Sequence, residues 1–131
     1  MHNLATVTSI AVAGALGTLA RWGLSGLSHR LLGDRFAWGT LAVNLIGCLV
    51  LGFLMEAVLS GTLIPRALRL PLAVGFCGAF TTFSTFGYET LRYIQAGNWL
   101  YAAGNTALNV ILGLGMVWLG FILARAISGG A

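Results

Sequence analysis

An uncharged stretch of 19 residues, Leu70–Tyr88, contains a run of hydroxyl, glycine and phenylalanine residues from Gly75 to Gly87. The stretch is long enough to cross a bilayer, whose hydrocarbon core takes about 20 residues of helix. Lipid offers no hydrogen-bond partners to hydroxyl groups or to a bent backbone, so such groups must face protein, a cavity or an ion. The sequence therefore predicts a membrane-spanning segment with a polar site at depth.

Polar and aromatic residues within this run recur at a spacing of three. Residues at this spacing share a face of a helix. The pairs are Thr81 with Ser84, Thr82 with Thr85, and Phe83 with Phe86. A helix here is expected to have one aromatic face beside two hydroxylated faces.

The rest of the chain is equally apolar. Its 131 residues are 58% hydrophobic and 8% charged, with a mean hydropathy of +0.91, whereas soluble domains carry about 25% charged residues. Four segments are long enough to span a bilayer, and together they use nearly the whole chain. They are Met1–Ala20 (continuing to about Leu32), Trp38–Met55, Leu70–Tyr88, and a segment within Tyr93–Ala124. We expect an all-α integral membrane protein, with residues 1–131 as a single four-helix transmembrane domain.

Several other interpretations are not favoured. The first segment lacks the basic start of a signal peptide, so we expect a retained helix. Cys48 and Cys77 lie in the middle of spans and are expected to be free buried thiols. His2 and His29 have no metal-ligand spacing, and the scattered arginines do not favour nucleic-acid binding.

The arginines also bear on orientation in the membrane. With four spans, each side of the membrane receives three of them. One side has Arg66, Arg69 and Arg125, and the other has Arg30, Arg35 and Arg92. This balance gives no positive-inside preference. The chain is therefore expected to insert in both orientations and to pair with an opposite copy about a two-fold axis in the membrane plane.

Glycines and amides mark places where the spans are not simple apolar helices. Most of the 19 glycines are expected to let helices approach closely. Gly75 and Gly78 directly precede the hydroxyl cluster, so we expect the third helix to be broken in the middle of the membrane, where freed carbonyls can coordinate a cation.

Three further polar residues share one face of the fourth span, because Tyr101, Asn105 and Asn109 recur every four positions. Asn44 adds an amide in the second span. A lone asparagine in a membrane is often a helix–helix contact, but this set exceeds what packing needs. Since no carboxylate lies at mid-span, amide donors, hydroxyls and the positive edges of phenyl rings favour an anion pathway.

Three motifs in the sequence resemble those of a known family. They are Gly14–Arg21, Gly39–Gly47 and Gly75–Phe86, the last followed by Glu89. Over essentially its full length the chain resembles the Fluc (CrcB) fluoride channels. The resemblance implies antiparallel, dual-topology homodimers with two fluoride pores and a structural sodium ion on the two-fold axis.

The resemblance also implies roles for individual residues. Backbone carbonyls of Gly78 and Thr81 would hold the sodium ion. The fluoride pore would be lined by Phe83, Phe86, Asn44, Thr82, Ser84, Thr85, Tyr101, Asn105 and Asn109. The chain departs from the family pattern at four positions. Asn105 and Asn109 stand where serines are expected, Trp22 replaces a tyrosine, and Ala79 replaces a glycine. Arg21 either attracts anions to a vestibule or pairs with Glu89 or a helix C-terminus.

The expected function is passive, fluoride-selective export of cytoplasmic fluoride by a multi-pass protein of the cell inner membrane. The main alternative is a small multidrug-resistance-type transporter, which has four short helices and dual topology but depends on a glutamate in the first span. Here the first span has only Arg21 as a charge. An intramembrane enzyme is disfavoured because no Ser/His/Asp or HExxH arrangement exists. A non-transporting assembly protein would explain the glycines but not the aligned donors.

Overall fold

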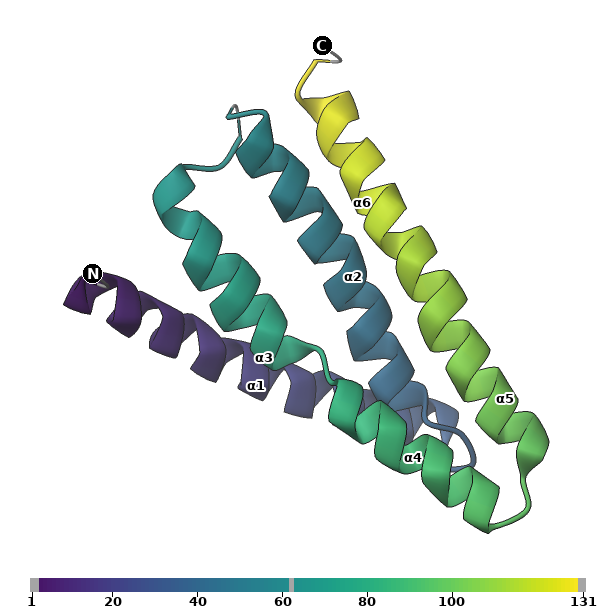
Figure 1. Ribbon diagram of the computed structural model, residues 1–131. Coiled ribbons are helices and arrows are strands. Elements are labelled where there is room, and N and C mark those ends of the chain that lie inside the picture. Colours follow the sequence, from purple (N-terminus) through teal and green to yellow (C-terminus); the bar gives the residue numbers. More distant parts are fainter. Residues whose placement is uncertain (1–2, 62, 130–131) are drawn as a thin grey trace.

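A computed structural model describes residues 3–61 and 63–129. In this part of the chain, four helical segments are long and apolar enough to cross a membrane (Figure 1). They are Leu4–Leu32, Trp38–Leu59, Arg66–Gln95 and Trp99–Ile127. The prediction of an all-α protein with four helices able to span a membrane is therefore confirmed.

The first two segments are single helices. Helix α1 (Leu4–Leu32) begins after Asn3, whose Oδ1 accepts a hydrogen bond from the backbone N of Ala5 at 3.0 Å. It ends at Gly33, whose φ of 81° favours glycine. Helix α2 (Trp38–Leu59) follows directly after a short loop. The end of α1 at Leu32 agrees with the expected extension of the first segment to about Leu32.

The third segment is irregular. It contains a 3₁₀ turn η1 (Arg66–Leu68), a π-helical stretch η2 (Pro71–Cys77), a short helix α3 (Gly78–Phe80) and helix α4 (Phe83–Gln95). Between α3 and α4 the backbone is extended, with ψ of 160° at Thr81 and 108° at Thr82. The expectation that Thr81 shares a helical face with Ser84, and Thr82 with Thr85, is therefore wrong, because Thr81 and Thr82 lie outside both helices.

The fourth segment begins within the expected range Tyr93–Ala124, after a short turn, and continues to Ile127. Tyr93 belongs to α4, and the chain turns at Gly97, whose φ is 74°. The backbone N of Asn98 closes this turn on the carbonyl of Tyr93 at 2.8 Å. The segment then runs through helix α5 (Trp99–Ala107), a π-helical stretch η3 (Leu108–Leu112) and helix α6 (Gly113–Ile127).

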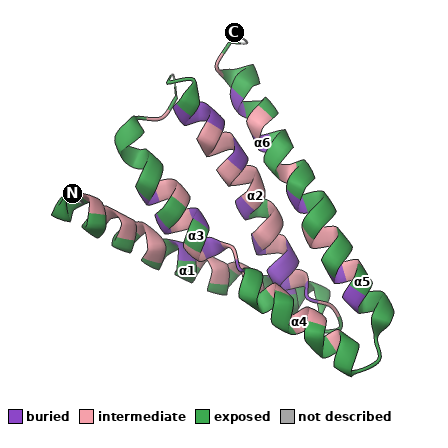
Figure 2. Ribbon diagram, viewed as in Figure 1, coloured by how far each residue is buried: buried purple, intermediate pink, exposed green. Residues whose placement is uncertain are grey.

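Helix α2 is the centre of the packing. It lies alongside α6, while α1 crosses the other segments (Figure 1). Figure 2 shows that α2 carries much of the buried surface, whereas α1 is largely exposed. Glycines set the closest approaches, because a Cβ at Gly52 would lie 2.1 Å from the carbonyl oxygen of Val117, and one at Gly120 would lie 2.1 Å from that of Leu49.

Gly120→Ala is expected to destabilise the protein by about 1–3 kcal/mol, because the methyl group meets backbone that cannot move aside without separating α2 from α6. Gly115→Ala is the matched control on the same helix, since a Cβ there meets nothing within 4 Å. Thermal unfolding in detergent measures both variants. Equal melting temperatures for the two would contradict this account of the α2–α6 contact.

Candidate functional site

A cleft of about 320 Å³ opens at the extended residues between α3 and α4. It is bordered by α2, by the third segment on both sides of the extended residues, and by η3 of the fourth segment. The residues lining it that the sequence singled out are Asn44, Gly78, Thr81, Thr82, Phe83, Phe86 and Asn109. The fold thus brings together in one place residues from three of the four segments.

Asn44 holds the extended backbone in place. Its Oδ1 accepts a hydrogen bond from the backbone N of Thr82 at 2.8 Å, and its Nδ2 donates to the carbonyl of Thr82 at 3.2 Å. A buried peptide group outside a helix needs such partners, and Thr82 is buried. One side chain from α2 therefore satisfies both backbone groups of Thr82, which lies between α3 and α4.

A chain of amide hydrogen bonds leads away from Asn44. Its Nδ2 also donates to Oδ1 of Asn109 at 2.9 Å. Asn109 Nδ2 in turn donates to the backbone carbonyl and to Oδ1 of Asn105, at 2.9 Å and 3.0 Å. Asn105 is fully buried, does not line the cleft, and donates to the hydroxyl of Thr90 at 3.0 Å. Both amide hydrogens of Asn44, and the amide group of Asn109, are thus bonded within the protein.

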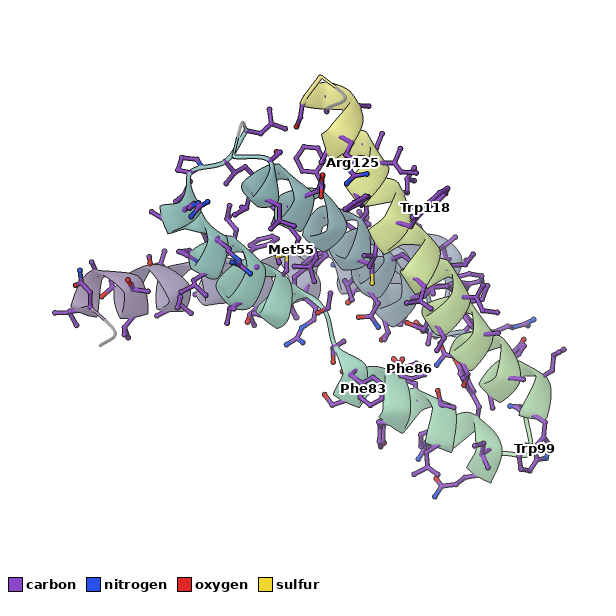
Figure 3. All side chains as sticks on the ribbon, turned by 45° about the horizontal axis from the view of Figure 1, so that its top comes forward. Met55, Phe83, Phe86, Trp99, Trp118 and Arg125 are labelled. Carbon is purple, nitrogen blue, oxygen red and sulfur yellow. The ribbon has the colours of Figure 1, made fainter. Side chains whose placement is uncertain are left out.

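Two phenyl rings lie at the beginning of α4, immediately after the extended residues (Figure 3). The ring centroids of Phe83 and Phe86 are 5.5 Å apart and the ring planes are tilted by 52°. Phe83 leaves 83% of its surface exposed, so within one chain it is not a core residue. Phe86 is partly buried, and both rings border the cleft.

The other predicted pore residues lie apart from the cleft lining. Thr85 and Ser84 are exposed, and Thr85 accepts a hydrogen bond from the hydroxyl of Thr82 at 2.9 Å. Tyr101 belongs to an aromatic cluster, with its ring centroid 5.6 Å from Tyr93 and 6.0 Å from Phe36. The spacing of four puts Tyr101 on the same helix face as Asn105, but two turns of helix separate it from Asn109.

The two charged candidates have different partners. Arg21 Nη1 donates to the carbonyl of Thr81, at the C-terminal end of α3, with a long distance of 3.4 Å. Glu89 instead accepts a hydrogen bond from the hydroxyl of Thr40 at 2.9 Å. Its second carboxylate oxygen is buried and has no hydrogen-bond partner among the described residues. Arg21 and Glu89 therefore do not pair in the described part of the chain.

Sequence reasoning missed three contributors. Thr40 lies one helical turn before Asn44, and this spacing of four was a usable signal. Thr90 likewise follows Phe86 by four, and its hydroxyl donates to the Phe86 carbonyl at 2.8 Å. The ion pair between Glu56 and Arg125, at 2.9 Å, joins the ends of α2 and α6 and has no local sequence signal.

Comparison with known proteins gives one consistent result. Residues 8–121 match the family model described as CrcB-like protein, Camphor Resistance (CrcB). Three curated relatives are each named "Fluoride-specific ion channel FluC". The protein from Pelobacter propionicus is 51% identical over 93% of this chain and 95% of its own length. That from Dehalococcoides mccartyi is 48% identical, covering 91% of this chain and 92% of its own. That from Geobacter metallireducens is 46% identical, covering 92% and 97%. With a family model covering most of the chain and relatives matched over nearly their whole length, this chain belongs to the CrcB family.

Proposed function

We propose that this chain is a passive fluoride channel that lets cytoplasmic fluoride leave the cell across the inner membrane. The observation that carries the proposal is the cleft in which amides from α2 and the fourth segment lie beside the rings of Phe83 and Phe86. It occurs in a chain whose relatives are named fluoride-specific ion channels. Those names describe channels and not enzymes, so the chain is not an enzyme.

The chemistry of the cleft suits a small anion. Fluoride is strongly hydrated, so a narrow path must return hydrogen bonds as water is removed. Amide N–H groups and the positive edges of phenyl rings can do this. None of the described residues lining the cleft is acidic, so no fixed negative charge there opposes an anion.

Conduction requires the amide network to rearrange. Both hydrogens of Asn44 Nδ2 already form hydrogen bonds, one with the carbonyl of Thr82 and the other with Oδ1 of Asn109. An anion that accepts a hydrogen bond from Asn44 Nδ2 would be repelled by the lone pairs of Asn109 Oδ1. Rotating the Asn109 side-chain amide by half a turn removes this repulsion and offers its NH₂ group to the ion. We infer that fluoride passes between Asn44 and Asn109 as this amide turns, a rotation that also breaks the two hydrogen bonds from Asn109 Nδ2 to Asn105. Thr82, Ser84 and Thr85 hydroxyls and Tyr101 are proposed to extend the polar track on either side.

We further propose an antiparallel, dual-topology homodimer with two pores. Three observations support it. The arginines divide evenly between the two ends of the spans. Phe83 is 83% exposed in the single chain. Gly78 is exposed too. A partner chain would cover this open side of the cleft.

The interruption fits a structural sodium ion on the two-fold axis. The backbone N of Thr82 would bond the carbonyl of Gly78 in a continuous helix, but it donates to Asn44 instead. The Gly78 carbonyl is thereby freed on an exposed side, and hard cations prefer such oxygen ligands. The carbonyl of Thr81 has the 3.4 Å contact with Arg21, which must lengthen for that oxygen to bind a cation. Held there, sodium would supply positive charge that joins the two chains, and Arg21 would remain a positive group beside it.

Fluoride efflux from liposomes containing the purified protein tests the function. Efflux is expected down the fluoride gradient without any added energy source, and chloride efflux under the same conditions should be far slower. A small multidrug-type transporter would instead move organic cations in exchange for protons. Absence of fluoride efflux from liposomes that hold correctly folded protein would refute the channel proposal.

Dual orientation is tested by thiol labelling at Ala96, the exposed residue that ends α4. Gly33 is a poor place for the label because its φ of 81° disfavours a side chain. In cells, Ala96→Cys is expected to react with a membrane-impermeant thiol reagent in about half of the molecules, and in the remainder only after the membrane is opened. A single accessible population would rule out dual topology.

A further inference from the structure

A second cleft lies away from the candidate pore, where the C-terminal end of α2 meets the beginning of the third segment. Its volume is about 620 Å³. The apolar wall includes Met55, Leu59, Leu70 and Val74, and Arg66 and Arg69 also line it. Figure 3 shows Met55 between α2 and the helical ribbon that leads to α3. The cleft is thus an apolar groove with two guanidinium groups at one end of the spans.

The two arginines are held on one short turn. They are three residues apart, and the backbone N of Arg69 donates to the carbonyl of Arg66 in the 3₁₀ turn η1. Residues at this spacing in a 3₁₀ turn project from the same side. Both arginines are exposed, so their guanidinium groups can approach one ligand together.

Nothing in the described chain neutralises this charge. The side chains of Arg66 and Arg69 have no hydrogen bond or ion pair with a described residue. The acidic residue beside Met55, Glu56, is already bound to Arg125 at 2.9 Å, and Arg125 also lies 4.4 Å from the centre of the Phe121 ring. Among the described residues lining the groove, none is acidic.

We propose that this groove binds one anionic phospholipid, with the phosphate between Arg66 and Arg69 and an acyl chain along the wall that Leu59 and Val74 help to form. The loop joins two segments able to span the membrane, so it lies at the level of lipid headgroups. Guanidinium groups bind phosphate through charge-assisted hydrogen bonds, and basic pockets between transmembrane helices are typical sites for such headgroups. A zwitterionic lipid would leave part of the positive charge unmatched.

Native mass spectrometry of the purified full chain measures the binding, with phosphatidylglycerol and phosphatidylcholine as the added lipids. The protein is expected to retain phosphatidylglycerol in preference to phosphatidylcholine. The double variant Arg66→Gln/Arg69→Gln should weaken phosphatidylglycerol binding about 30-fold, given the contribution of each arginine near a charged surface. The matched control, Arg30→Gln/Arg35→Gln, removes two exposed arginines from the other end of the spans and should change binding less than about twofold. Equal losses in the two double variants, or no loss in the first, would overturn the proposal.

A second arm tests the groove separately from the charges. Val74 is 58% exposed, so Val74→Trp should fill the groove without disturbing the fold, and phosphatidylglycerol binding should fall about tenfold. Glycerol phosphate, which has the phosphate but no acyl chain, should not displace the lipid at millimolar concentration. If it displaces the lipid, or if Val74→Trp binds lipid normally, the acyl chain does not occupy the groove and the proposal fails. Both arms are read without fluoride, so their outcome is independent of the channel function.

Discussion

Asn109→Asp is expected to lower fluoride flux about a thousandfold. The substitution changes one NH₂ group to oxygen at nearly constant volume, and it places a negative charge in the cleft beside Asn44. Two unit charges about 4 Å apart repel by roughly 4 kcal/mol at the effective dielectric constant of a protein site. That energy corresponds to about three powers of ten in rate. Fluoride efflux from liposomes measures the loss.

Asn109→Ser is the matched control at the same position. A serine hydroxyl rotates freely between donating and accepting, and the shorter side chain releases one hydrogen of Asn44 Nδ2. Flux is therefore expected to equal or exceed that of the unchanged protein. Circular dichroism and the elution volume in detergent establish that both variants fold. If Asn109→Asp conducts normally while folded, fluoride does not pass beside Asn109, and the amide rotation proposed above is wrong.

Phe83→Ile and Phe86→Ile are each expected to lower fluoride flux at least tenfold in folded protein. Isoleucine is apolar but lacks the positive ring edge that we propose faces the anion. Phe83 is 83% exposed in the single chain, so its replacement should cost that chain little stability. Flux and unfolding temperature are measured on the same preparations, which separates conduction from packing.

A second phenylalanine pair provides the control on the other side of the extended residues. Phe76 and Phe80 have ring centroids 5.6 Å apart, close to the 5.5 Å of Phe83 and Phe86. Neither Phe76 nor Phe80 lines the cleft, and Phe80 is only 5% exposed. Phe80→Ile should therefore lower the unfolding temperature and leave flux nearly unchanged. If all three variants lose flux alike, the rings act through packing and not through contact with the ion.

The candidate site could be predicted from the sequence as a set of residue types but not as an arrangement. Asn44 and Asn109 stand out because amides are costly in lipid, and both lie in the cleft. Asn105 stands out for the same reason, yet it is fully buried and bonded to Thr90. Spacing along a helix tells which residues share a face, but not which part of that face meets a neighbour. For the same reason, Tyr101 shares a helix face with Asn105 and Asn109 but lies in a separate aromatic cluster.

The number and approximate bounds of the helical segments follow from the sequence alone, because a bilayer needs a fixed length of apolar residues and each segment can be read locally. Family membership also follows from the sequence, since its motifs are runs of consecutive residues. The tertiary structure alone decided the partners of the polar groups. Asn44 bonds Thr82, 38 positions away, and Asn109, 65 positions away, while Arg125 bonds Glu56 at a separation of 69. Such pairs depend on how each helix is rotated and shifted against the next, and that is set by glycine contacts between whole helices, such as those of Gly52 and Gly120.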